Sequence, residues 1–126
     1  MESADFIIVV IVVEDEAIIR MVLTDALTDA GFEVLEASHA LEAVAVLKLE
    51  GKRVHALFTD IHMPGEMDGL MLAHHTRSRW PGISLLVTSG LARPMTADMP
   101  IGTRFIPKPY DISNVTRHIR EMAQAA

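Results

Sequence analysis

The sequence predicts an α/β protein with a doubly wound, five-stranded parallel sheet, and three observations support this fold class. Short apolar runs alternate with longer segments of helical periodicity, and the alternation repeats five times along 126 residues. The first apolar run is an unbroken stretch of Ile and Val after Phe6, which is typical of a strand buried on both faces. The length suits a single domain over residues 1–126, with a core from about residue 6 to residue 123.

Five apolar runs are predicted as strands: Phe6–Val13, Glu33–Ala37, Val54–Thr59, Ile83–Thr88 and Thr103–Ile106. The first run is too short to cross a membrane, which takes roughly 20 apolar residues. Acidic residues precede it, whereas a secretory signal would begin with basic ones. Because the chain also has no cysteine, we expect a cytoplasmic protein without disulfides or thiolate metal sites.

Helices are expected between the strands. Ala17–Ala30 has an apolar face at helical spacing, formed by Ile18, Val22, Leu23, Ala26, Leu27 and Ala30. Two further helices are predicted over His39–Glu50, with Ser38 as N-cap, and over Leu70–Arg79. A last helix is expected to run to about Met122, with Asp111 or Ser113 as its cap.

The composition excludes several classes of function. The chain has 11 Lys and Arg against 17 Asp and Glu, a formal net charge of −6. Such an acidic chain is poorly suited to binding nucleic acid, which requires cations against the phosphates. No G-x-G-x-x-G motif follows the first strand, which argues against a dinucleotide-binding domain.

Polar side chains follow the predicted strands at the edge where ligands of such sheets bind. Glu14 and Asp15 end the first strand, Asp60 the third and Thr88 the fourth, and Lys108 follows the fifth. Crowded carboxylates repel one another unless a cation is present, and oxygen ligands suit a hard cation such as Mg²⁺. The metal, the ammonium and the hydroxyl would together hold an anionic group, as phosphoryl transfer requires, and an Asp can be the nucleophile.

Five short motifs contain these residues: Val12–Glu16, Thr59–Pro64, Met67–Gly69, Val87–Gly90 and Pro107–Pro109. In this order and at these strand ends they resemble the receiver domains of two-component response regulators. The resemblance covers nearly the whole chain. It implies a flavodoxin-like (βα)5 fold with strand order 2-1-3-4-5 and five helices.

The resemblance also implies a role for each acidic position. Asp60 would be the phosphoacceptor and Asp15 the acidic residue that binds Mg²⁺, with Glu14 as its partner. The backbone carbonyl of His62 would complete the protein's share of the metal ligands.

The remaining family positions concern the phosphoryl group and the switch. Lys108 would pair with the phosphoryl oxygens, Thr88 would move toward the phosphoryl group, and Phe105 would be the aromatic switch residue. The resemblance further implies a cis peptide bond before Pro109.

Two segments depart from the family pattern. Met63–Gly69 is one residue longer than the commonest form of this loop. Leu91–Gly102 contains Pro94, Pro100 and few strong helix formers, so we expect at most a short helix over Arg93–Asp98 in place of the usual fourth helix. We expect this segment to be loosely ordered before phosphorylation, with Met95 and Met99 as its main apolar anchors.

The function predicted is that of a signalling phosphoacceptor, not an enzyme acting on other substrates. It would take a phosphoryl group from a phosphohistidine on a sensor histidine kinase or a histidine phosphotransfer protein, and act on an unknown downstream protein as a monomer or weak homodimer. No effector domain is expected, because the last helix uses up the chain.

Several alternatives stay open at this level. The chain can be a receiver excised from a hybrid histidine kinase, since its loop and its Val87–Gly90 motif look similar to such attached receivers. A small-molecule phosphatase with an aspartate nucleophile would need a second carboxylate two residues later, where this chain has His62. A degenerate receiver is disfavoured because all catalytic positions hold competent residues. The six histidines are expected to be structural or surface residues.

Overall fold

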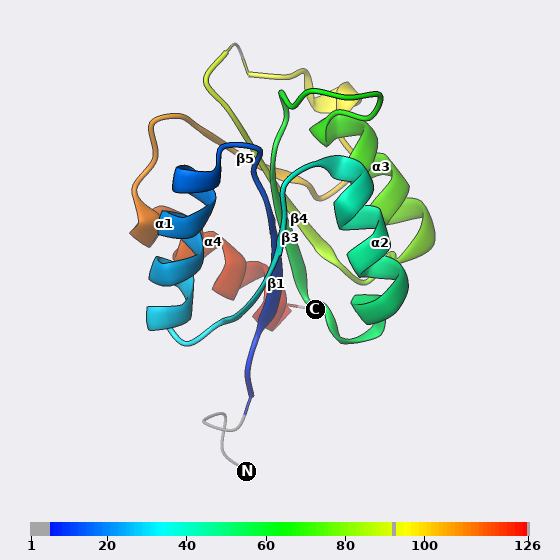
Figure 1. Cartoon of the computed structure of the whole chain (residues 1–126). Helices are drawn as coiled ribbons and strands as arrows, with labels where there is room; N and C mark the ends of the chain where they lie inside the picture. Colours follow the sequence, from blue (N-terminus) through cyan, green and yellow to red (C-terminus); the bar gives the residue numbers. More distant parts are fainter. Residues whose placement is uncertain (1–5, 92, 126) are drawn as a thin grey trace.

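The computed structural model describes residues 6–91 and 93–125. Its centre is a five-stranded parallel sheet in the order β2-β1-β3-β4-β5 (Figure 1). The strands are β1 (Val9–Val13), β2 (Glu33–Ala37), β3 (Ala56–Asp60), β4 (Ser84–Ser89) and β5 (Arg104–Pro107). The strand order therefore reverses at β1, and the carboxyl ends of β1 and β3 lie next to each other, where such folds bind ligands.

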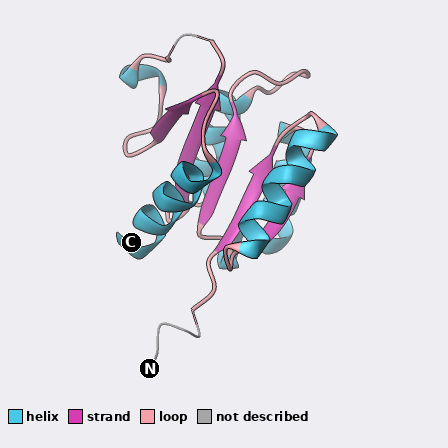
Figure 2. Cartoon of the chain, turned by 90° about the vertical axis from the view of Figure 1, so that its left-hand side faces the viewer, coloured by secondary structure: helices cyan, strands magenta, loops and turns pink. Residues whose placement is uncertain are grey.

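Helices cover both faces of the sheet. They are α1 (Ala17–Asp29), α2 (Ala40–Glu50), α3 (Gly69–Arg79) and α4 (Ile112–Ala125). α1 and α4 pack on one face, and α2 and α3 pack on the other (Figures 1 and 2). Short 3₁₀ turns follow α2, as η2 (Gly51–Arg53), and precede β5, as η3 (Thr96–Asp98). None of the helices in the described part of the chain is long and apolar enough to cross a membrane.

Two apolar layers hold the helices to the sheet. Along β1, Val9, Ile11 and Val13 face α2 and α3, whereas Val10 and Val12 face α1 and α4. Successive side chains of a strand point to opposite faces, so a central strand covered on both faces must be apolar at every position. This explains the unbroken apolar run in the sequence.

The first strand is shorter than predicted. Phe6 and Ile7 are exposed by 51% and 55%, and β1 begins only at Val9, which pairs with Glu33. β3 likewise begins at Ala56, because η2 and its cap Val54 occupy the preceding residues. Apolar composition predicts burial, but a strand needs a neighbour to pair with.

The predicted apolar face of the first helix is partly wrong. Leu23 and Leu27 are buried as expected, but Ile18 and Val22 are 72% and 56% exposed. Helical periodicity permits more than one apolar stripe, and only the stripe containing Leu23 contacts the sheet.

The ends of the later helices also differ slightly from prediction. α2 begins at Ala40 with His39 as N-cap, whose Nδ1 accepts from the Glu42 N–H at 3.2 Å. Ser38, the predicted cap, instead donates from its N–H and hydroxyl to the Glu42 carboxylate at 2.6 and 2.7 Å. α4 continues past Met122 to Ala125.

The structure has four α-helices in its described residues, because the segment between β4 and β5 forms only the turn η3. Met99 anchors this segment in the core, whereas Met95 is 71% exposed. Two side chains of α3 hold its backbone: His74 Nε2 bonds the Asp98 carbonyl at 2.8 Å, and Arg77 donates to the Ile101 carbonyl. The segment is thus irregular in conformation but attached to α3.

Candidate functional site

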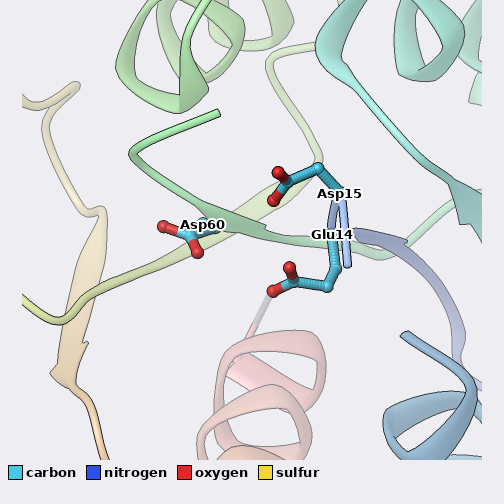
Figure 3. Close-up of side chains that lie close together, drawn as sticks. All are labelled: Glu14, Asp15 and Asp60. Atoms are coloured by element: carbon cyan, nitrogen blue, oxygen red, sulfur yellow. The ribbon is translucent and has the colours of Figure 1, made fainter. Parts of the chain in front are cut away.

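Three carboxylates meet at the carboxyl ends of β1 and β3. Each of Glu14, Asp15 and Asp60 offers an oxygen that lies within 4.8 Å of the others. Figure 3 shows the three side chains turned toward a common space. Glu14 and Asp60 are 2% and 7% exposed, whereas Asp15 lies on the surface. The parallel register places these strand ends side by side, as the sequence predicts.

Lys108 reaches this group from the end of β5. Its Nζ lies 2.5 Å from Asp60 Oδ2 and 3.9 Å from Glu14 Oε1. Burial alone would lower the pKa of Lys108. The hydrogen bond to Asp60 and the nearby negative charges outweigh burial and raise that pKa above its ordinary value of 10.5. The ammonium therefore stays charged at neutral pH. The Lys108–Pro109 peptide bond is cis, as the resemblance implies.

Burial changes the acidity of Glu14. Burial raises the pKa of Glu14 above 4.5, and the charge of Asp60 acts in the same direction. The Glu16 N–H, 3.0 Å from Glu14 Oε2, and the charge of Lys108 partly oppose this shift. One ammonium among three carboxylates leaves the site with a net negative charge. A bound cation would relieve the repulsion between the carboxylates. Carboxylate oxygens, one of them solvent-accessible, are the donor set expected for Mg²⁺.

The two expected switch residues occupy neighbouring strands. The hydroxyl of Thr88 is buried at the end of β4 and has no hydrogen-bond partner among the described residues. Five other buried side-chain atoms of the described residues also have no partner, so this feature does not by itself single out Thr88. Phe105 is half-buried on β5, and the Arg93 guanidinium lies 5.2 Å from its ring centroid.

His62 has an exposed side chain and contacts the site through its backbone. Its N–H donates to Asp60 Oδ1 at 3.0 Å, which orients the Asp60 carboxylate. Together with Lys108, this amide occupies both oxygens of Asp60.

Three residues at the site were not predicted from the sequence as contributors. Gly69 begins α3 directly against the strand end: a Cβ at this position would lie 2.0 Å from the Asp60 carbonyl oxygen. Arg20 donates to the Glu14 carbonyl at 2.7 Å. Tyr110 packs edge-on against Phe58, and burial, with the charges of Glu14 and Asp60, raises its pKa to about 12. The residues next to these three in the sequence do not indicate the contacts. Gly69 alone could have been predicted as a contributor, because it belongs to the Met67–Gly69 motif.

A cavity of about 510 Å³ adjoins Asp15. Its walls are the beginning of α2 and residues 64–67 of the long loop. This loop therefore lies beside Asp15, as the sequence predicts, and Gly65 has a φ of 108° there. A left-handed conformation of this kind favours glycine.

The sequence profile of the response regulator receiver domain matches residues 10–120. The chain belongs to this family. Receiver domains are the phosphoacceptor parts of two-component systems and interact with histidine kinases or phosphotransfer proteins.

Curated relatives resemble this receiver domain over most of its length. It is 34% identical over 120 residues to the sensor kinase CckA of Brucella abortus, a match covering 91% of this chain and 12% of the kinase. It is 35% identical over 107 residues to the transcriptional regulator NtrC of Salmonella typhimurium, covering 82% of this chain and 22% of NtrC. The chain thus spans a small part of these relatives.

Solved structures agree with the fold. A response regulator receiver protein from Sinorhizobium medicae superimposes with a TM-score of 0.87 at 25% identity, over 95% of this chain and 97% of that one. The receiver domain of the hybrid histidine kinase CckA gives a TM-score of 0.80 at 29% identity, over 92% and 99% of the two chains.

Proposed function

We propose that Asp60 is the phosphoacceptor of this receiver domain. The observation that carries the proposal is the grouping of the nearly buried Asp60 carboxylate with two further acids and the Lys108 ammonium, 2.5 Å away. In the transfer, an Asp60 oxygen attacks the phosphorus of a phosphohistidine. The phosphorus–nitrogen bond breaks, the imidazole leaves with the electron pair and takes a proton from solvent, and an aspartyl phosphate results.

The other side chains of the site have complementary tasks. Glu14, Asp15 and Asp60 would hold Mg²⁺, which supplies charge neutralisation for the phosphoryl oxygens. Lys108 pairs with a phosphoryl oxygen, because its ammonium already faces the acceptor carboxylate. Thr88 donates to the new oxygens its buried hydroxyl, which has no hydrogen-bond partner within residues 6–91 and 93–125. Movement of Thr88 toward the phosphoryl group brings β4 into the switch, together with Phe105 on the adjacent strand.

The phosphodonor protein is proposed to dock against α1. Ile18, Met21 and Val22 are 72%, 55% and 56% exposed, and they lie at helical spacing just after Asp15. A contiguous apolar patch on a surface helix is typical of a protein interface. A histidine kinase or phosphotransfer protein bound there would be adjacent to Asp60. The likeness to the receiver of a hybrid kinase supports a place in such a relay, attached or separate.

Phosphorylation with phosphoramidate and Mg²⁺, followed by intact-mass measurement, tests the acceptor. The unmodified chain is expected to gain one phosphoryl group, and Asp60→Asn none. Asp68→Asn is the matched control, because Asp68 caps α3 by accepting from the Met71 N–H at 2.9 Å and Asn preserves that acceptor. Incorporation into Asp60→Asn at the unmodified rate would contradict the assignment.

A further inference from the structure

The end of the molecule opposite the acidic site carries a second concave surface. A cavity of about 360 Å³ lies between residues 47–53, at the end of α2, and Trp80, at the end of α3. These segments precede β3 and β4, whereas the acidic group follows the strands (Figure 1). We call this cavity the basal hollow.

One wall of the basal hollow is fixed in place. The indole of Trp80 lies on the backbone of Gly51: a Cβ on Gly51 would be 2.4 Å from Trp80 Nε1. The Arg79 guanidinium lies 5.9 Å from the indole centroid, and the ring of His75 meets it edge-on at 6.1 Å. The side chain is therefore held before any ligand arrives.

The charge around the basal hollow is opposite to that of the chain. Arg53 pairs with Glu33 and Glu50 at 2.7 and 2.5 Å, so its charge is compensated. Lys48, Lys52 and Arg79 make no ion pair in the described part of the chain. With Arg53, these residues give four cations against the two carboxylates of Glu33 and Glu50, a local excess of two positive charges in a protein whose formal net charge is −6.

Helix electrostatics accounts for only part of this arrangement. Cations near the ends of α2 and α3 favour the negative ends of the helix dipoles, and this explains Lys48 and Arg79. It does not explain Lys52, which follows α2, or Leu49, which is 84% exposed at the rim. Lys52 therefore adds a cation that helix electrostatics does not account for, and Leu49 adds an exposed apolar contact beside it.

We propose that the basal hollow binds an acidic peptide segment of a partner protein, with carboxylates on Lys48 and Lys52 and an aliphatic side chain against Leu49. The concave shape favours a protruding segment over a flat lipid surface. Stacking of a nucleobase is disfavoured, because Gly51 covers the Trp80 indole and Arg79 lies over the ring. Since the basal hollow lies far along the fold from Asp60, its partner can bind together with a phosphodonor.

Trp80 is the only tryptophan of the chain, so its fluorescence and its indole N–H resonance report directly on the basal hollow. The probe is a pentapeptide with two glutamates on each side of a leucine. Titration is expected to shift both signals and the amide resonances of residues 47–53. The same peptide with glutamines in place of the glutamates is expected to give no shift.

Two double variants separate charge from structure. Lys48→Glu with Lys52→Glu is expected to weaken peptide binding by roughly tenfold, because two exposed attractions become repulsions. Lys48→Arg with Lys52→Arg retains the charge and is expected to bind normally. If Lys48→Glu unwinds the end of α2, as circular dichroism would show, Lys52→Glu alone gives the test.

Three outcomes would overturn the proposal: no shift of the Trp80 signals at millimolar peptide, equal binding by the charge-reversed variant, or equal binding of the glutamine peptide. Vesicles containing phosphatidylserine serve as the comparison. Co-sedimentation with these vesicles, lost in the charge-reversed variant and without any peptide response, would assign the surface to a membrane instead.

Discussion

Magnesium should stabilise the folded protein, and Asp15→Asn should remove most of that effect. Asp15 is the best position for the test because it is exposed and makes no ion pair among the described residues. Its replacement therefore disturbs little besides the acidic group. Glu14 and Asp60 are less suitable, since both also face Lys108.

The expected magnitude follows from binding linkage. At a Mg²⁺ concentration ten times the dissociation constant, the free energy of unfolding rises by about 1.4 kcal/mol. For a chain of 126 residues, this corresponds to an increase in Tm of about 5 °C. In the ion-free protein, carboxylates with oxygens within 4.8 Å repel by about 1 kcal/mol at a water-like dielectric. Asp15→Asn should therefore be equally stable or slightly more stable without metal.

Thermal unfolding followed by circular dichroism, with and without Mg²⁺, measures both effects. Asp25→Asn is the control, because Asp25 is an exposed α1 acid without an ion pair in the described structure and lies outside the acidic group. The control should keep the full magnesium response. An equal rise in Tm for Asp15→Asn and the unmodified protein would refute the assignment of the metal ligands.

Three further predictions address the surroundings of the site. The single tyrosine, Tyr110, should titrate near pH 12 by ultraviolet absorbance, because burial and then the neighbouring acids raise its pKa to about 12. The contribution of its phenol to the free energy of unfolding is then fully present below about pH 10 and is lost as pH rises through 12. Titration near pH 10 in the folded protein would contradict this. Gly69→Ala should lower the free energy of urea unfolding by about 1–3 kcal/mol, since its Cβ would lie 2.0 Å from a backbone oxygen, while Gly82→Ala, with open space around it, should change little. Amide hydrogen exchange across residues 91–102 should be fast and should slow on adding beryllofluoride with Mg²⁺. Arg77→Ala should speed the exchange, because it removes a hydrogen bond to this segment. Strong protection before activation would rule out ordering of this segment as the switch.

The fold was largely predictable because its signals are local. A strand covered on both faces has to be apolar throughout, and the run through Val13 shows this without knowledge of its neighbours. The polar residues ending successive strands, such as Asp15 and Asp60, are predictable for a related reason. In a parallel sheet all carboxyl ends lie at one edge, so alternation of strands and helices already places these residues together.

The orientation of the first helix was not predictable from its periodicity. Ile18 and Leu23 are both apolar, yet one is 72% and the other 2% exposed. Which stripe is buried depends on how α1 packs against the sheet and α4. That choice is made by contacts distant in sequence, and it leaves the apolar surface that we assign to the phosphodonor.

The sequence by itself determined the parallel sheet, the chemistry of the strand ends and the lack of a regular helix between Pro94 and Pro100, because backbone propensity and side-chain alternation act over a few residues. The tertiary structure alone decided that Gly69 packs on the Asp60 backbone, that the Thr88 hydroxyl is buried without a partner among the described residues, and that Trp80 and Lys48 share one cavity. These features arise from contacts between segments far apart in the chain, whose distances no local pattern records.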